Sequence, residues 1–381
     1  MAARILLCTV GTSLFIPNLE RLKTDLLEGK LPPQRQALAR AYQDKAWDNV
    51  AEELAPIHAA ERVCGAEINS IWSLLGRGDV VADCGLYFLH SDTDDGRAIG
   101  AILERYYGAR GHSPAKAVQI ADLQDADPKR FRSKGLRQLA RDICRILREH
   151  GTPYCAINAT GGYKAQIAIA VLLGQALGVP VYYKHERFDE IIAFPPMPVS
   201  FDFGLWMRAS GMLFDLDRNP EPAPADAYQE EWDERFESLV DRVPIDGRSY
   251  IELSPTGQVF HETFRERFRT ARDQVLPPAI PATEKQAPRL EASGWPGEHP
   301  EVERFLRHVT DEVPFVRHCA TFYFNPDLPG RTRFRVSAHG LEGVLSGDSY
   351  TVKFRIESSA RTDEQRAAAA AALNEWLASS K

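Results

Sequence analysis

The chain has 381 residues and a formal net charge of -7, with 46 basic and 53 acidic side chains. This length suffices for two or three domains, and the acidic balance argues against a general nucleic-acid-binding coat, so any RNA contact needs a local basic patch. The six cysteines are scattered singly, which makes a disulfide framework and a zinc site improbable and fits a reducing cytoplasm. No apolar stretch reaches the length of a membrane span and no signal-peptide pattern opens the chain, so we predict a cytoplasmic protein with no membrane partner.

Residues 1–200 alternate apolar strands with helices, beginning with a strand at 4–10. This alternation predicts an α/β fold with a doubly wound, mainly parallel sheet. A hairpin of strands 180–184 and 190–194 is expected to close the domain. The other elements predicted here are strands at 85–90, 117–121 and 154–158 and helices at 17–27, 33–57, 61–75, 97–107, 133–150 and 165–177.

Two polar turns follow apolar strands in this region. The first contains Gly11, Thr12 and Ser13, and the second contains Asn158, Thr160, Gly161, Gly162 and Lys164. A strand, a turn with paired glycines and a helix that begins with a lysine can present free N–H groups to a phosphate. The spacing is not that of a Walker loop, because Ala165 stands where Ser or Thr would hold magnesium. Since the order of strands reverses in such sheets, we expect both turns at one anion-binding crevice. The alternative is that the glycines serve only the geometry of the turn.

Residues 201–280 are predicted to form a small helical connector. Helices are expected at 201–216, 228–240 and 257–275, around a short strand at 250–253. Helices that flank a small strand suit a winged-helix module.

Residues 281–381 are predicted to form an α+β domain, with a helix at 300–309, a strand at 315–324 and a closing helix at 361–377. Two further strands, 331–336 and 350–357, alternate basic with apolar residues. The basic residues are Arg331, Arg333 and Arg335 in the first strand and Lys353 and Arg355 in the second. Side chains at i and i+2 share a face, so neighbouring strands would merge these residues into one patch. The alternative is the ordinary solvated face of an antiparallel sheet.

The two polar turns, Gly11-Thr12-Ser13 and Asn158-Ala159-Thr160-Gly161-Gly162-Tyr163-Lys164, resemble those of the CARF domains of CRISPR-associated proteins. The resemblance covers residues 1–200 and implies a Rossmann-like homodimer. It implies that the dimer binds a cyclic oligoadenylate, most often cyclic tetra-adenylate, as an allosteric activator across its two-fold axis. A secondary hypothesis is slow ring-nuclease activity, in which Ser13 and Lys164 position a ribose 2′-hydroxyl and stabilise the charged phosphorane.

Residues 281–381 resemble RelE-type mRNA interferases in the order of their elements and in their basic strands. The resemblance implies an endoribonuclease, a hydrolase that cuts mRNA on the ribosome with no metal and no cofactor. The 2′-hydroxyl would attack the adjacent phosphate while fixed cations stabilise the pentavalent transition state. The residues assigned by position are Arg333, Arg335, Lys353 and Arg355 for phosphate clamping and His339 for proton transfer, with Tyr350 and Glu357 as alternatives.

The preferred hypothesis is therefore a homodimeric, cyclic-oligoadenylate-activated ribonuclease of type III CRISPR antiviral defence, with the ribosome and mRNA as partners. One rival is a stand-alone ring nuclease in which the C-terminal segment is a scaffold. The other is a transcription regulator in which residues 228–275 dock on DNA as a winged helix. The acidic residues between 230 and 237 count against DNA binding.

Overall fold

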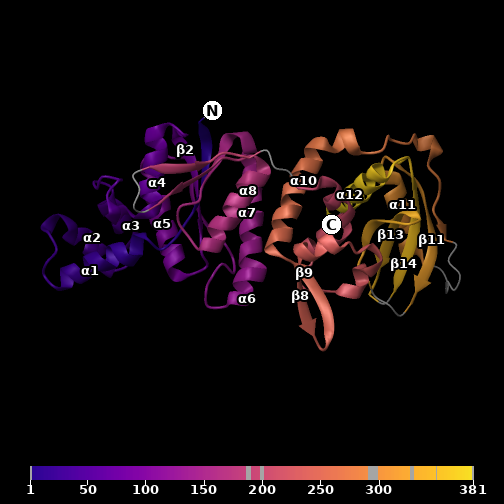
Figure 1. Cartoon of the computed structure of the whole chain (residues 1–381), viewed down its shortest axis with the longest axis horizontal. Helices are drawn as coiled ribbons and strands as arrows, with labels where there is room; N and C mark the ends of the chain where they lie inside the picture. The colour runs from indigo at the N-terminus through magenta and orange to yellow at the C-terminus, as the bar shows by residue number, and fades with distance from the viewer. Residues whose placement is uncertain are drawn as a thin grey trace. The chain divides into compact units, whose positions relative to one another are not determined.

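The computed structural model describes residues 2–185, 190–197, 201–290, 299–326, 330–348 and 350–379. The chain divides into two compact units, residues 1–200 and residues 201–381 (Figure 1). Each unit has its own sheets and helices and is described by itself below.

A six-stranded sheet forms the centre of unit 1–200. Its strands, in the order β3-β2-β1-β4-β5-β6, are β3 (Ala115–Gln119), β2 (Val80–His90), β1 (Ala3–Thr9), β4 (Cys155–Asn158), β5 (Val181–Lys184) and β6 (Ile191–Phe194). The first five pair in parallel and β6 runs antiparallel to β5. The predicted parallel α/β sheet and its closing hairpin are thus confirmed. The order of strands reverses between β1 and β4, so the loops that follow these two strands leave the sheet side by side.

Helices cover both faces of this sheet (Figure 1). On one face, α4 (Gly65–Arg77) and α5 (Asp94–Gly108) share a buried apolar cluster with Leu6 and Cys8 of β1. The same cluster extends through η1 (Leu14–Leu19), α2 (Pro33–Gln43) and α3 (Trp47–Leu54), with α1 (Glu20–Leu27) packed against it. On the other face, α7 (Leu136–His150) packs against α8 (Lys164–Leu177). The short elements η2 (Arg62–Cys64), α6 (Pro128–Arg130), η3 (Phe131–Gly135) and η4 (Thr152–Tyr154) complete the unit.

The helix predicted at 33–57 is two helices. The chain breaks between α2 and α3 at Lys45, whose φ is +55°. A residue in this left-handed region cannot continue a right-handed helix.

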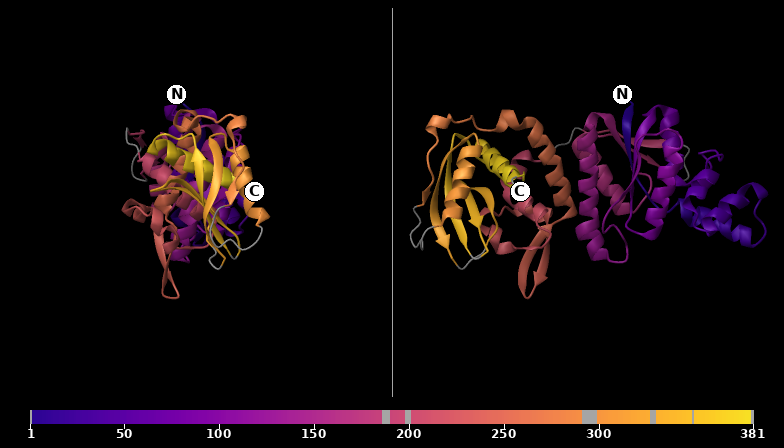
Figure 2. Two further views of the ribbon diagram at one scale, coloured as in Figure 1. Left: turned by 90° about the vertical axis from the view of Figure 1, so that its right-hand side faces the viewer. Right: turned by 180° about the vertical axis from the view of Figure 1, so that it is seen from behind.

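A five-stranded sheet dominates unit 201–381. Its order is β10 (Arg289–Leu290), β11 (Val316–Asn325), β14 (Thr351–Ser358), β13 (Gly340–Ser346) and β12 (Arg333–Ser337), with only β10 and β11 parallel. Three helices pack on it: α9 (Phe203–Arg218), α11 (Pro300–Glu312) and α12 (Asp363–Ser379) (Figure 2). A smaller sheet of β7 (Ala223–Pro224), β9 (Arg248–Leu253) and β8 (Val240–Ile245) precedes α10 (Pro255–Val275), and η7 (Ala282–Glu284) follows it.

The two modules predicted at 201–280 and 281–381 share one hydrophobic core. Trp206 of α9 and Phe264 of α10 belong to the same buried cluster as Phe334 and Phe354 of the large sheet. The structure therefore joins the expected connector to the domain that follows it. The helix predicted at 228–240 does not form as one element. It is replaced by two 3₁₀ segments, η5 (Ala225–Glu231) and η6 (Glu234–Leu239), because the two residues between them have extended backbone angles.

Strand β13 was not predicted, and it lies between the two basic strands β12 and β14. Glycine weakens a strand pattern because it has no side chain to pack. At Gly343, however, a Cβ atom would lie 2.1 Å from the ring of Phe354, so the packing of that ring requires glycine. The two basic strands are consequently not direct neighbours.

Candidate functional site

A cavity of about 720 Å³ opens where the turns after β1 and β4 meet. Its lining combines backbone of the two turns with polar and aromatic side chains from η1, α4 and β5. Among the residues that the structure describes, this lining contains basic side chains and no aspartate or glutamate. The residues that contribute to it include Gly11, Thr12, Ser13, Asn18, Arg62, Ala66, Asn69, Trp72, Thr160, Gly161, Gly162, Tyr183, Lys184 and His185.

The glycines allow the two turns to pack backbone against backbone. A Cβ atom at Gly11 would lie 2.5 Å from the amide nitrogen of Gly162, and one at Gly161 would lie 2.8 Å from the amide nitrogen of Gly11. Gly162 also has a φ of +104°, a conformation that L side chains rarely adopt. These glycines are therefore required by the close packing of the two turns, and the packed turns form the floor of the cavity.

A buried carboxyl group, Glu67 of α4, lies against this floor. Its Oε1 accepts a hydrogen bond from the N–H of Gly11 at 2.7 Å, and its Oε2 accepts one from the hydroxyl of Ser13 at 3.3 Å. The Ser13 Oγ in turn accepts a hydrogen bond from the N–H of Ala66 at 2.8 Å. Glu67 is 1% exposed, and burial raises its pKa although the hydrogen bonds that it accepts act in the opposite direction. The Gly11 N–H is therefore already paired, and the Ser13 hydroxyl is held in one orientation.

Asn158 and Thr160 connect strands to one another. Asn158 is 1% exposed, and its Nδ2 donates to Ser70 Oγ at 2.8 Å. Its Oδ1 accepts from Thr160 Oγ1 at 2.6 Å, and Thr160 Oγ1 accepts from the backbone N–H of Lys184 at 3.0 Å. Asn158 lies behind the cavity wall because its amide links β4 to α4, whereas Thr160 is part of the wall.

The basic residues of the cavity differ from the one expected. Lys164 is exposed at the start of α8 and does not belong to the lining. Lys184 at the end of β5 does line the cavity, and its Nζ donates to Ser73 Oγ at 2.8 Å. Arg62 is exposed and also lines it. The position of Lys184 at the carboxyl end of a parallel strand was a usable signal in the sequence, whereas Arg62 had none.

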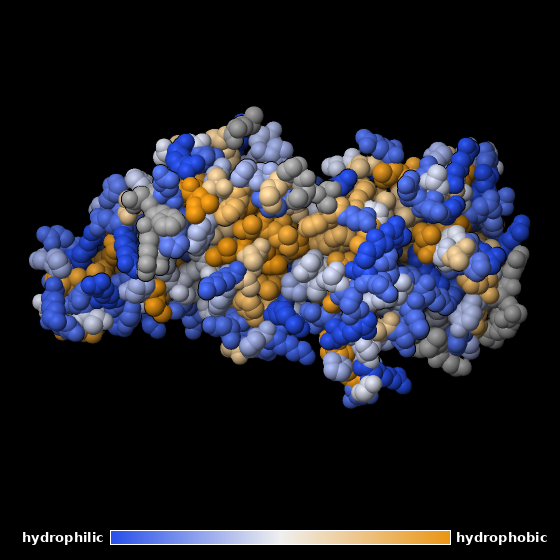
Figure 3. Space-filling view, in the orientation of Figure 1, coloured by the Kyte–Doolittle hydropathy of each residue, from blue (hydrophilic) through white to orange (hydrophobic). Residues whose placement is uncertain are grey.

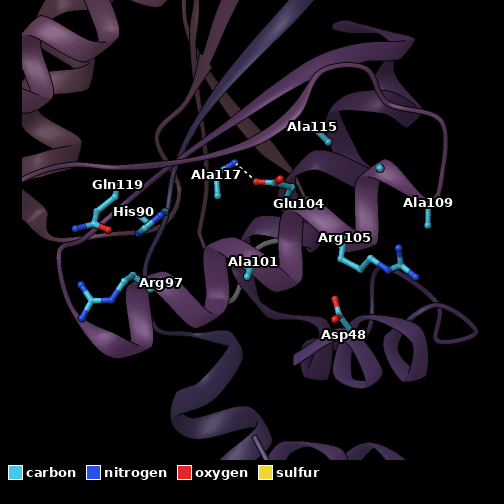
Figure 4. A pocket seen from close by; sticks show the side chains of 11 residues that line it. Asp48, His90, Arg97, Ala101, Glu104, Arg105, Ala109, Ala115, Ala117 and Gln119 are labelled. Atoms are coloured by element: carbon cyan, nitrogen blue, oxygen red, sulfur yellow. Dashed lines mark hydrogen bonds between the residues drawn. The ribbon is translucent and has the colours of Figure 1, made fainter. Parts of the chain in front are cut away.

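Two other cavities in unit 1–200 contain acidic side chains. One, of about 710 Å³, lies beside β3 and α5 and is lined by Asp48 and Glu104 as well as Arg97 and Arg105 (Figure 4). The other, of about 460 Å³, is lined by residues that include Asp94 and Asp95. Because carboxylates repel an anion, the cavity at the turns is the better anion site of the three.

The basic residues predicted for RNA cleavage share one face of the five-stranded sheet. Arg335 and Arg355 lie on either side of Glu342, and Arg333 and Lys353 lie on either side of Val344, in two adjacent rows. Four residues of the expected patch therefore lie together across three strands, with an acidic residue between two of them. Arg331, the fifth, precedes β12, and its Nε lies 3.7 Å from Asp215 Oδ2.

Two glutamates of η5 cover most of that patch. Arg333 Nε lies 2.8 Å from Glu231 Oε1, and Lys353 Nζ lies 2.9 Å from Glu230 Oε1. Arg335 pairs with Glu230 as well, and the two cations lower the pKa of Glu230 to about 2. The Arg333 and Arg335 side chains are only 4% and 5% exposed. These two arginines are thus buried in ion pairs, whereas we expected them to be open to a phosphate.

His339 and Arg355 line a different cavity, of about 350 Å³, at the edge of this face. The sequence reasoning missed His318 and Arg366, which line it too. Glu357 is part of the same lining, and its carboxylate oxygens lie 3.2 Å from Arg317 Nε and 3.2 Å from His318 Nδ1.

Tyr350, an alternative for proton transfer, instead stacks on Phe324, with ring centroids 6.2 Å apart. Within the described ranges, no group of three or more His, Cys, Asp or Glu residues is arranged to hold a metal ion. In the same residues, no helix is both long and apolar enough to cross a membrane.

Residues 62–197 match the family model described as CRISPR-associated protein (Cas_APE2256). The match covers about a third of the chain, includes α4, β4 and Lys184, and supports the CRISPR association expected from the turns. None of the curated proteins matches the chain. Can2 from Sulfobacillus thermosulfidooxidans, solved in complex with cyclic tetra-adenylate (cA4), is similar at 12% sequence identity with a TM-score of 0.24. That alignment covers 71% of this chain and 66% of the Can2 chain, just under two thirds of its length.

Proposed function

We propose that residues 1–200 bind a cyclic oligoadenylate, with cyclic tetra-adenylate as the ligand, and that binding activates the protein in CRISPR antiviral defence. The observation that carries this proposal is the cavity at the reversal of strand order. It combines a floor of backbone turns with Arg62 and Lys184 and has no carboxylate among its described lining residues. Each phosphodiester of the ligand carries a negative charge, which these cations attract. The match of residues 62–197 to a CRISPR-associated family supports the biological setting.

A homodimer would suit a ring with two-fold symmetry, because each copy supplies the same contacts. Helix α8 follows the turn that carries Gly161 and Gly162, and its apolar residues include the exposed Ala168 and the partly exposed Val171 and Leu172. Figure 3 shows apolar residues gathered over the part of the molecule where α7 and α8 lie. We propose that this surface joins two copies. Ligand binding would then favour the active state through its higher affinity for that state.

Calorimetric titration of the full chain with cyclic tetra-adenylate tests the binding proposal. The variant Arg62→Ala should lose about tenfold in affinity, the effect of one hydrogen bond to a charged group. Arg105→Ala is the matched control, because Arg105 is an exposed arginine in the cavity that also holds Asp48. Failure of the wild-type chain to bind the ring, or equal losses in the two variants, would contradict the proposal. Light scattering of the same sample tests the homodimer.

We propose, second, that residues 201–381 form an endoribonuclease that the first unit activates. The observation that favours this function is the cavity that holds His318 and His339 together with Arg355 and Arg366. Glu357 of the same lining is paired with Arg317 and His318, which offset its charge. One imidazole can accept the proton of an RNA 2′-hydroxyl as its oxygen bonds to phosphorus. The other imidazole can donate a proton to the departing 5′-oxygen as the P–O5′ bond breaks. The two guanidinium groups can hold the negative charge that develops on the phosphate oxygens.

The RelE-type resemblance assigns this activity to mRNA on the ribosome, with Arg333, Arg335 and Lys353 as phosphate clamps. For those three cations to reach a phosphate, Glu230 and Glu231 must first move away from them. We propose that ligand-dependent withdrawal of η5 would open this part of the face.

Cleavage of labelled mRNA in a translation extract, with and without cyclic tetra-adenylate, tests the ribonuclease. His318→Ala and His339→Ala should each lower the rate by about 10²-fold or more, the usual contribution of a general acid or base. His308→Ala is the control, because His308 lies on α11 outside the cavity. Full activity in both cavity variants would refute this site. The same mixtures show whether the ring itself is cleaved and whether Ser13→Ala stops that reaction.

A further inference from the structure

The cavity between the two turns has an exposed tryptophan in its wall. Trp72 of α4 is 43% exposed, whereas Trp206 in the other unit is completely buried. The Trp72 ring makes an edge contact with His58, with centroids 5.1 Å apart and planes at 68°. A large apolar ring that stays in water forgoes the free energy of burial, which a flat ligand lying on it would recover.

Helix α4 places this ring at a distance from the floor of the cavity. Ala66, Asn69 and Trp72 all line the cavity and are three residues apart, so they follow one another along one face of the helix. The Ala66 N–H holds Ser13 of the first turn, which marks the end next to the floor. The six residues from Ala66 to Trp72 advance roughly 9 Å along the helix axis. The wall therefore runs from the backbone floor, beside which Arg62 and Lys184 lie in the same lining, to an aromatic surface, as a phosphate and the base attached to its sugar would require.

Two asparagines of the cavity lining, Asn69 of α4 and Asn18 of η1, have fixed orientations. The Nδ2 of Asn69 donates to the carbonyl oxygens of Ala59, at 2.6 Å, and Glu61, at 2.9 Å. The Nδ2 of Asn18 donates to the carbonyl oxygens of Ser13, at 2.8 Å, and Arg62, at 2.7 Å. Both hydrogens of each amide are thereby used, so each Oδ1 remains as an acceptor. Within the described part of the chain, neither Oδ1 receives a hydrogen bond.

We propose that Trp72 stacks on an adenine of the bound ring and that Oδ1 of Asn69 and of Asn18 accepts hydrogen bonds from adenine amino groups. This inference rests on the proposed binding of cyclic oligoadenylate and adds the residues that recognise the base. Hypoxanthine and guanine have a carbonyl oxygen where adenine has its 6-amino group. An acceptor facing an acceptor leaves both groups unpaired, so rings of these bases are rejected.

Affinity measurements on the full chain with three probes test this assignment: cyclic tetra-adenylate, cyclic tetra-inosinate and a linear adenylate tetramer. Stacking on an aromatic side chain predicts that Trp72→Ala weakens binding of cyclic tetra-adenylate roughly 5- to 150-fold. Trp72→Phe should retain most of the affinity but lose the quenching of tryptophan fluorescence that stacking causes. Tyr154→Ala is the control, because Tyr154 is similarly exposed at 45% and lies outside the cavity lining. The wild-type chain should bind the inosinate ring at least tenfold more weakly than the adenylate ring.

The outcomes separate this inference from the proposed function. If Arg62→Ala weakens binding and Trp72→Ala does not, base stacking is refuted while ring binding stands. Equal affinities for the adenylate and inosinate rings refute the role of the asparagines. If the wild-type chain binds none of the three probes, the proposed function fails and this inference fails with it.

Discussion

Replacing Arg333 by alanine should destabilise unit 201–381 strongly, because this arginine is half of a buried ion pair. Its Nε lies 2.8 Å from Glu231 Oε1, and the two side chains are 4% and 7% exposed. Its guanidinium also lies 4.8 Å from the centroid of the Tyr228 ring and donates to the carbonyl oxygen of Arg331 at 3.2 Å. Removing one partner leaves the other charge buried and unpaired, which costs about 3–5 kcal/mol.

That cost can be measured by calorimetry of the full chain. In a unit of this size, 3–5 kcal/mol lowers the unfolding temperature by roughly 6–20 °C. Arg355→Ala is the matched control, because Arg355 is an exposed arginine on the same face and its loss should change stability by only about 0.5 kcal/mol. A double variant, Arg333→Met with Glu231→Leu, should recover much of the loss because no charge is left unpaired.

The two arginine variants also separate structural from catalytic roles. Arg355→Ala should keep the native unfolding temperature and lose RNA cleavage. If Arg333→Ala unfolds at the native temperature yet no longer cleaves RNA, the buried ion pair is not what this residue contributes, and the reasoning above is refuted.

Three further predictions concern the cavity of unit 1–200. Gly161→Ala should weaken binding of cyclic tetra-adenylate and cost about 1–3 kcal/mol of stability, because its Cβ would lie 2.0 Å from Glu67 Oε1. Calorimetric titration measures the binding, and Gly76→Ala is the control because its Cβ would have no atom within 4 Å. Normal binding by Gly161→Ala would contradict the packing described. Burial raises the pKa of Glu67, so folding favours its protonated form and wild-type stability falls as pH rises above the ordinary value of 4.5. Glu67→Gln removes this titration, so the urea midpoint of the variant should rise relative to that of wild type between pH 5 and pH 8. If the difference between the two midpoints does not change with pH, the prediction is wrong. Arg62→Ala should also flatten the salt dependence of ring binding, since one fewer cation faces the phosphates, and an unchanged slope in titrations at several salt concentrations would count against this contact.

Local patterns in the sequence were sufficient to predict the strand, the turn and the helix at the cavity. The apolar strand, the turn with Gly161 and Gly162 and the following helix are contiguous, so the prediction did not depend on distant residues. Glu67 and Trp72 lie within a helix that has no motif of its own. Glu67 is buried and Trp72 faces the cavity, and this difference is set by the packing of α4 on the sheet, which the sequence of the helix does not reveal.

The face of the five-stranded sheet that carries the basic residues shows why the alternation of basic and apolar residues was not enough to predict an open site. The pattern correctly placed Arg333 and Arg335 on one face of their strand. Glu230 and Glu231, which cover them, are about a hundred residues away in the sequence, and the expected helix at 228–240 gave no reason to bring them there. Nothing in the alternation distinguishes a basic residue that meets solvent from one that meets a glutamate.

The hydrogen bond from the Ala117 N–H to Glu104 Oε2, at 2.7 Å, has a consequence for assembly. Strand β3 is the outermost strand of its sheet, where unpaired backbone groups could recruit a foreign strand and start aggregation. An incoming strand would have to displace this carboxylate and leave its charge beside peptide oxygens. The Glu104 carboxylate thereby hinders pairing of another strand with β3 at Ala117.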